Sequence, residues 1–222
     1  MFQQPRRPVL HLIACGAQPA ADLEPFVKTC QRQGWDVWLI ATPSALKHLD
    51  KDALAELTGH GVCVDHNRLD EPSALPPAGA LAVVPASFKT VTKLAYGDCQ
   101  TFALGLLNEA IGLGLPILAV PAPNEALARH PAFGESIARL RAWGVIVLFD
   151  AYGYPLAPQH GGGDAADLPW RTAEEVLCGW IRFARLPAPG AGSTYPAEAY
   201  RLTVESAEAY RPAVAMAQPV AD

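Results

Sequence analysis

Small and hydroxyl-bearing residues follow several short apolar runs of this sequence, at the point where each run ends. Gly16 and Ala17 follow the first run, and Thr42 and Ser44 follow the second. A longer group follows the run near residue 84: Pro85, Ala86, Ser87, Phe88, Lys89 and Thr90. Each hydroxyl alone fits a structural role as a helix N-cap. Several helix starts at one place also predict an anion site, because free backbone N–H groups and helix dipoles converge there.

The order of elements along the chain places these groups at one edge. We expect strands at residues 9–14, 36–41, 61–64, 80–84, 116–120 and 145–149. Helical patterns lie between them, at residues 23–30, 45–49 with a further stretch at 53–57, 90–113, 133–140 and 172–184. Strands that alternate with helices predict a three-layer α/β fold of the Rossmann-like (flavodoxin-like) kind, a parallel six-stranded sheet with helices on both faces. Ligands of such sheets bind outside the carboxyl ends of the strands.

Composition bounds the possible functions. The 222 residues are 50% hydrophobic and 18% charged, which is enough apolar material for a sizeable core. The net charge is −5, so there is no basic excess to drive nucleic-acid binding. No run approaches the roughly 20 apolar residues of a membrane span. The 5 cysteines are scattered without zinc spacing, which predicts reduced thiols, a cytoplasmic location and no metal site.

Two regions are expected. Residues 1–185 form one domain, and residues 186–222 are a Pro/Ala-rich tail. The tail is either a solvated segment or an extended arm. In the second case Tyr195, Tyr200 and Tyr210 would anchor it to a neighbour.

Three motifs then occur in register over more than 50 residues. The first is Pro85-Ala86-Ser87-Phe88-Lys89-Thr90 and the second is Lys93-Leu94-Ala95-Tyr96-Gly97. The third is Pro121-Ala122-Pro123-Asn124, followed by Pro131-Ala132 and Leu140. This segment resembles the homo-oligomeric flavin-containing cysteine decarboxylase superfamily, whose motifs are Pro-Ala-Ser/Thr-Ala-Asn-Thr, Lys-(Ile/Leu)-Ala-x-Gly and Pro-Ala-Met-Asn.

The resemblance implies that FMN lies at the carboxyl edge of the sheet, at a subunit contact in a homotrimer or homododecamer. It also implies a small-molecule or peptide-cysteine substrate. Asn124 would lie near the isoalloxazine or the substrate. The implied cofactor-binding residues are Gly16, Ala17, Thr42, Ser44, Pro85, Ala86, Ser87, Thr90 and Ala122.

The chain also departs from the decarboxylase pattern. Lys89 replaces the Asn that holds the substrate carboxylate, and it makes the run resemble the Ser-x-Lys-Thr of flavin prenyltransferases. Glu71 stands at the position of the active-site His, so His66 and His60 are the nearest replacements. The clamp cysteine of phosphopantothenoylcysteine decarboxylase is missing from the Gly-rich region 159–164.

Two classes of function therefore stay open. The first is FMN-dependent oxidative decarboxylation of a cysteine-like substrate other than phosphopantothenoylcysteine, with His66, Lys89 and Asn124 as catalytic residues. His66 follows Asp65, and such a pair suits acid–base work, although a loop His is also explained by a structural role. The second is a catalytically inactive FMN-binding or regulatory protein. A flavin-prenyltransferase-like activity is a third option.

Overall fold

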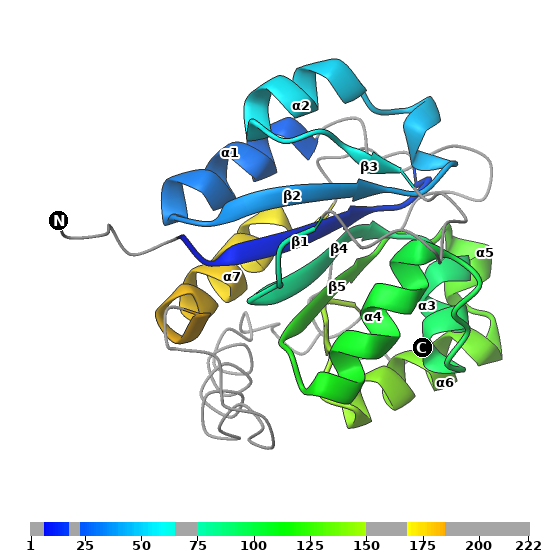
Figure 1. Cartoon of the computed structure of the whole chain (residues 1–222). Helices are drawn as coiled ribbons and strands as arrows, with labels where there is room; N and C mark the ends of the chain where they lie inside the picture. Colours follow the sequence, from blue (N-terminus) through cyan, green and yellow to red (C-terminus); the bar gives the residue numbers. More distant parts are fainter. Residues whose placement is uncertain (1–6, 18–22, 65–74, 150–167, 185–222) are drawn as a thin grey trace, which may run out of the picture.

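The computed structural model describes residues 7–17, 23–64, 75–149 and 168–184. Its centre is a parallel six-stranded sheet in the order β3-β2-β1-β4-β5-β6 (Figure 1). The strands are β1 (Val9–Ala14), β2 (Asp36–Ala41), β3 (Cys63–Val64), β4 (Ala80–Ala86), β5 (Ile117–Pro121) and β6 (Ile146–Val147). The expected fold class is confirmed.

Helices cover both faces of the sheet (Figure 1). One face carries α1 (Leu23–Gln33), α2 (Lys51–Thr58) and α7 (Trp170–Ala184), and the short 3₁₀ helix η2 (Ala45–Lys47) precedes α2. The other face carries α3 (Phe88–Ala95), α4 (Phe102–Leu113), α5 (Glu125–Ala128) and α6 (Pro131–Ala142). No helix among these described residues is long and apolar enough to cross a membrane.

Two apolar clusters hold the three layers together. Phe26 and Trp35 are buried in the first, between the sheet and the helices α1 and α7. Leu107 and Phe133 are buried in the second, between the sheet and the helices α4 and α6. Because the central strands are covered on both faces, β4 reads as an uninterrupted buried run of seven residues.

The single helix expected over residues 90–113 is wrong, because the chain turns between α3 and α4. Gly97 adopts a φ of 72°, a left-handed conformation that ends α3. Thr101 then caps α4 by accepting a hydrogen bond from the backbone N–H of Leu104, at 3.2 Å. Asp98 fastens the turn by accepting from Lys93 Nζ at 2.9 Å and from the Gln100 backbone at 2.7 Å, and these bonds lower its pKa.

Smaller differences concern strand and helix ends. β4 continues through Ala86 instead of ending at Val84, and β3 and β6 are shorter than the apolar runs that predicted them. The helical patterns 45–49 and 53–57 correspond to η2 and α2, and α2 begins earlier than predicted because Asp50 caps it by accepting from the Ala53 backbone at 3.0 Å.

Candidate functional site

The carboxyl ends of β1, β2, β4 and β5 meet at one edge of the sheet and are joined there by backbone hydrogen bonds. The Thr42 N–H donates to the carbonyl of Ala14 at 3.0 Å, and the Cys15 N–H donates to the carbonyl of Pro85 at 3.2 Å. The Ala122 N–H donates to the carbonyl of Ala86 at 2.8 Å. These bonds continue the strand pairing into the loops, so the segments that carry the expected site residues are held side by side.

The start of α3 supplies two hydroxyls and free backbone donors. Ser87 is the N-cap, and its Oγ accepts from the Thr90 N–H at 3.2 Å. The Ser87 and Thr90 hydroxyl oxygens are 2.9 Å apart. The N–H groups of Phe88 and Lys89 lie in the first helical turn and have no acceptor within the helix. Such a helix start attracts an anion.

The loop after β2 contributes two further hydroxyls. Thr42 Oγ1 is buried and has no hydrogen-bond partner among the described residues. Ser44 precedes η2 without capping it through its side chain, and it is exposed. A buried hydroxyl without a partner is costly, so Thr42 is a position that a ligand would satisfy.

Gly16 joins the first loop to the second. A Cβ built at Gly16 would lie 2.4 Å from the Cβ of Ser44 and 2.9 Å from its backbone carbon. Ser44 therefore approaches the backbone of Gly16 closely. Without a side chain at residue 16, the two loops lie against each other and Ser44 is held at the strand edge.

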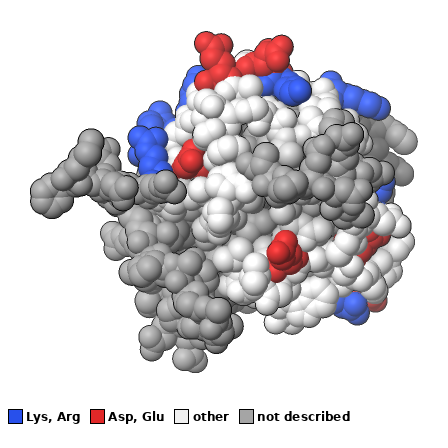
Figure 2. Space-filling model, in the orientation of Figure 1, with Lys and Arg blue, Asp and Glu red and all other residues white. Residues whose placement is uncertain are grey.

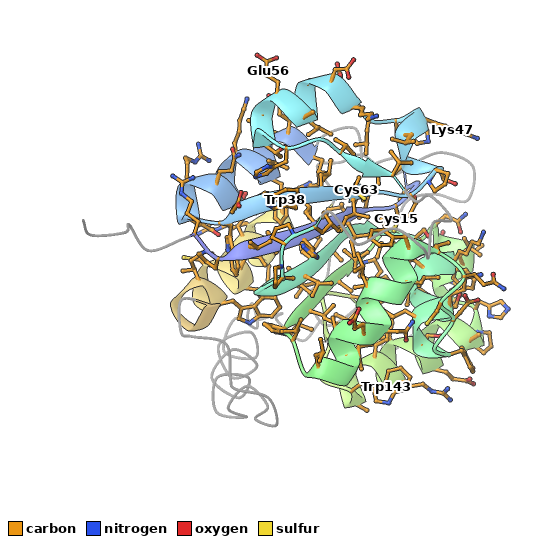
Figure 3. The ribbon with its side chains drawn as sticks, viewed as in Figure 1. Cys15, Trp38, Lys47, Glu56, Cys63 and Trp143 are labelled. Carbon is orange, nitrogen blue, oxygen red and sulfur yellow. The ribbon has the colours of Figure 1, made fainter. Side chains whose placement is uncertain are left out.

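Cys15 is a member of this edge to which the sequence motifs assign no role. Figure 3 shows it where β1 ends. Its sulfur lies 3.2 Å from Thr90 Oγ1, and burial raises the pKa of the thiol. The thiol therefore stays protonated and serves as a hydrogen-bonding group, not as a nucleophile.

Lys89 and Asn124 lie in different local environments at this edge. Lys89 is exposed in the first turn of α3, a turn without acidic residues. A cation is unfavourable at a helix N-terminus unless an anion binds beside it. Asn124 caps α5, because its Oδ1 accepts from the Leu127 N–H at 2.9 Å. Its amide nitrogen remains as a donor group.

Phe88 is a second residue that the sequence interpretation did not assign. Its ring stacks on Phe133 of α6, with a centroid distance of 5.4 Å, and meets His130 edge-on at 5.8 Å. These contacts fix the first turn of α3 against α6, and thereby fix the direction of the helix start. The aromatic residue within the motif is the sequence feature that could have predicted this packing role.

Of the two histidine candidates, only His60 lies within the described residues, and it lies away from this edge. His60 binds Asp36 Oδ1 at 2.7 Å and stacks on Trp38 at 3.9 Å. Asp36 is the first residue of β2, so His60 lies at the amino end of the sheet, and its suggestion as a replacement base is wrong. His66, Glu71, the region 159–164 and the tail 186–222 lie outside the described residues.

The fold and this edge define a class: a doubly covered parallel α/β protein with hydroxyls and helix-start N–H groups at the strand ends. The chain belongs to the Flavoprotein family, which matches residues 3–179. No curated protein matches the chain.

Several solved structures share the fold. The FMN-dependent cysteine decarboxylase SpaF aligns with a TM-score of 0.61 at 15% identity, covering 82% of this chain and 100% of that one. HAL3 from Cryptococcus neoformans aligns with a TM-score of 0.60 at 21% identity, covering 81% and 98%. A PPC decarboxylase mutant complexed with pantothenoylaminoethenethiol aligns at 0.59 and 19%, covering 80% and 98%. At these identities the solved structures show that the chain shares their fold. The match to the Flavoprotein family confirms the flavoprotein part of the expected resemblance and supports a flavin cofactor.

The contact between Gly16 and Ser44 gives a first prediction. We expect Gly16→Ala to destabilise the protein by about 1–3 kcal/mol, because the added methyl must displace the backbone of the second loop. Urea unfolding followed by tryptophan fluorescence measures the change. Gly105→Ala is the matched control, since a Cβ there meets nothing within 4 Å and a helical Gly→Ala change stabilises by about 0.5–1 kcal/mol. Equal stability of the two variants would contradict the close contact.

Proposed function

We propose that the protein binds FMN at the carboxyl edge of the sheet and uses it in the oxidative decarboxylation of a cysteine-like substrate other than phosphopantothenoylcysteine. The observation that carries this proposal is the start of α3, where two hydroxyls and free N–H groups adjoin the ends of β1 and β4 in a chain of the Flavoprotein family. The neighbour SpaF is described as an FMN-dependent cysteine decarboxylase. The cytoplasmic location stays a prediction.

The residues present fit FMN. The phosphate would bind at Ser87, Thr90 and the N–H groups of the first turn of α3, a turn that contains no acidic residue. Thr42 supplies a buried hydroxyl that has no partner in the part of the chain that the structure describes, which suits a further polar group of the cofactor. The other expected contacts lie in the joined loops of this edge: Gly16, Ala17, Ser44, Pro85, Ala86 and Ala122.

The roles of the substrate-side residues follow from their chemistry. FMN supplies a two-electron oxidation when bound, which prepares a cysteine derivative for loss of carbon dioxide. The Lys89 ammonium would hold the substrate carboxylate as a point charge with three donors. The amide nitrogen of Asn124 would orient the substrate by donating a hydrogen bond. His66 is proposed to move the thiol proton.

A second candidate is an FMN-binding protein without turnover. It is favoured by the combination of Lys89 at the position of the carboxylate-holding Asn and of Asn124, whose oxygen already caps α5. The substitution at Lys89 and the capping bond of Asn124 both concern the substrate side and leave the phosphate side intact. A flavin-prenyltransferase-like activity would retain Lys89 in a Ser-x-Lys-Thr run.

Cofactor binding is tested by absorption and by one charge substitution. The purified protein should show a flavin spectrum, and Ser87→Asp should weaken FMN binding by about 2–4 kcal/mol through repulsion of the phosphate. Asp is as good an N-cap as Ser, so α3 keeps its start. Thr29→Asp on α1 adds the same charge away from this edge and should leave binding unchanged. A colourless protein that takes up no added FMN would remove the proposal.

Substrate choice is tested by mass-spectrometric detection of carbon dioxide from the FMN-loaded protein. We expect little or no release from phosphopantothenoylcysteine and release from a peptide that ends in cysteine. Lys89→Ala should raise KM for the peptide while FMN stays bound, because the carboxylate loses its cation. Lys28→Ala, an exposed lysine of α1, should change neither value. Rapid turnover of phosphopantothenoylcysteine contradicts the proposed substrate, and no release from either compound favours the inactive protein.

We further propose that the protein is a homotrimer or homododecamer. Asn108 and Glu109 are the polar residues of the otherwise apolar α4, and Leu113 at its end is 57% exposed. Figure 2 shows few charged side chains over α3 and α4. Light scattering should give a multiple of 23.6 kDa, and Leu113→Lys should lower the mass. A monomer with FMN bound argues against this assembly.

A further inference from the structure

The buried thiol of Cys15 contacts the start of α3 at two points. Its sulfur is 3.2 Å from Thr90 Oγ1, and it also forms a hydrogen bond with the backbone of Ser87. The residue is 1% exposed, and burial raises the pKa of the thiol, so the sulfur keeps its proton. Thr90 Oγ1 in turn lies 2.9 Å from Ser87 Oγ. Three side chains thus form one continuous hydrogen-bonded series.

The direction of this series decides what it offers to a ligand. Ser87 and Thr90 have two hydroxyl protons and one hydrogen bond between them. If Cys15 donates to Thr90, that bond uses one hydroxyl proton and the other is left for a ligand. If Cys15 instead accepts from Thr90, both hydroxyl protons are used inside the protein. Only lone pairs then face the ligand, and lone pairs repel a phosphate.

Donation by Cys15 is the favoured direction. Sulfur is a weak acceptor, and the Ser87 backbone N–H already donates to it. The S–H proton is buried, and the hydroxyl oxygen of Thr90 is the acceptor that the structure places beside it. If Thr90 donated to Cys15 instead, the buried S–H proton would lose this acceptor and the sulfur would have to accept two hydrogen bonds.

We propose that Cys15 is a positioning residue that donates to Thr90 and thereby keeps one hydroxyl proton of the Ser87–Thr90 pair directed at the ligand. A donor held in this way favours an acceptor-only group such as phosphate. The inference rests on the proposed function and deepens it: Cys15 makes the site prefer a phosphorylated flavin to riboflavin, which lacks that group. Cys15 itself touches neither the flavin nor the substrate.

The direction of donation is tested without any flavin. The S–H stretching band of cysteine lies in an infrared window free of other protein absorption, and it moves to lower frequency when the thiol donates. Subtracting the spectrum of Cys15→Ala from that of the wild type isolates the band of Cys15. We expect a lowered frequency, which Thr90→Val should raise toward that of a free thiol. A band at the free-thiol frequency in the wild type would overturn the inference.

The preference for phosphate is tested by titrating FMN and riboflavin and following flavin fluorescence. In Cys15→Ala, Thr90 can turn into the vacated space, so we expect FMN affinity to fall about three- to tenfold. Riboflavin affinity should stay unchanged, and Cys15→Ser, whose hydroxyl also donates, should recover FMN binding. Cys30→Ala is the matched control, because Cys30 is equally buried but lies on α1, in the other apolar cluster.

The outcomes separate the two proposals. If the wild type binds FMN and Cys15→Ala weakens FMN and riboflavin equally, the inference is overturned and the proposed function stands. If Cys30→Ala has the same selective effect as Cys15→Ala, the role assigned to Cys15 is likewise overturned. If the wild type binds neither flavin, the proposed function fails, and the phosphate preference fails with it.

Discussion

The central position of β1 is the constraint on which the rest of the structure depends. β1 pairs in parallel with β2 on one side and β4 on the other, over residues in continuous register. Parallel strands end at the same edge, so this pairing brings together loops that are far apart in the sequence. The hydrogen bonds of Cys15 and Thr42 to the neighbouring strands extend the pairing by one residue, and they place hydroxyls from two segments at one edge.

Much of this arrangement could be predicted from the sequence, because it depends on periodic burial. The apolar runs gave the six strands and the class of fold. The break between α3 and α4 was missed although Gly97 and Thr101 signal a helix end and a helix start, since the apolar stripe continues across both. Contacts such as that between Cys15 and Thr90 join residues 75 positions apart, and no local pattern reports them. The roles of the site residues stay predictions.

The mixed motif at the start of α3 has a physical explanation in packing. Phe88 occupies the position of a small residue in the decarboxylase pattern, and it fills the space between α3 and α6 by stacking on Phe133. Lys89 follows it on the exposed side. The two substitutions therefore act in different places, one on the internal support of the helix and one on the surface where a substrate carboxylate would lie.

The two outermost strands have a consequence for how copies of this protein can associate. β3 and β6 each contain two residues, so they offer little unpaired backbone to an added strand. β2 pairs with β3 only at Ile40 and Ala41. In the first half of β2, Asp36 forms a hydrogen bond with the His60 ring and Trp38 stacks on that ring. Edge strands as short as these protect a sheet from intermolecular strand addition, which is the route to fibrillar aggregates. Among the described residues, contacts between copies are left to the helical faces.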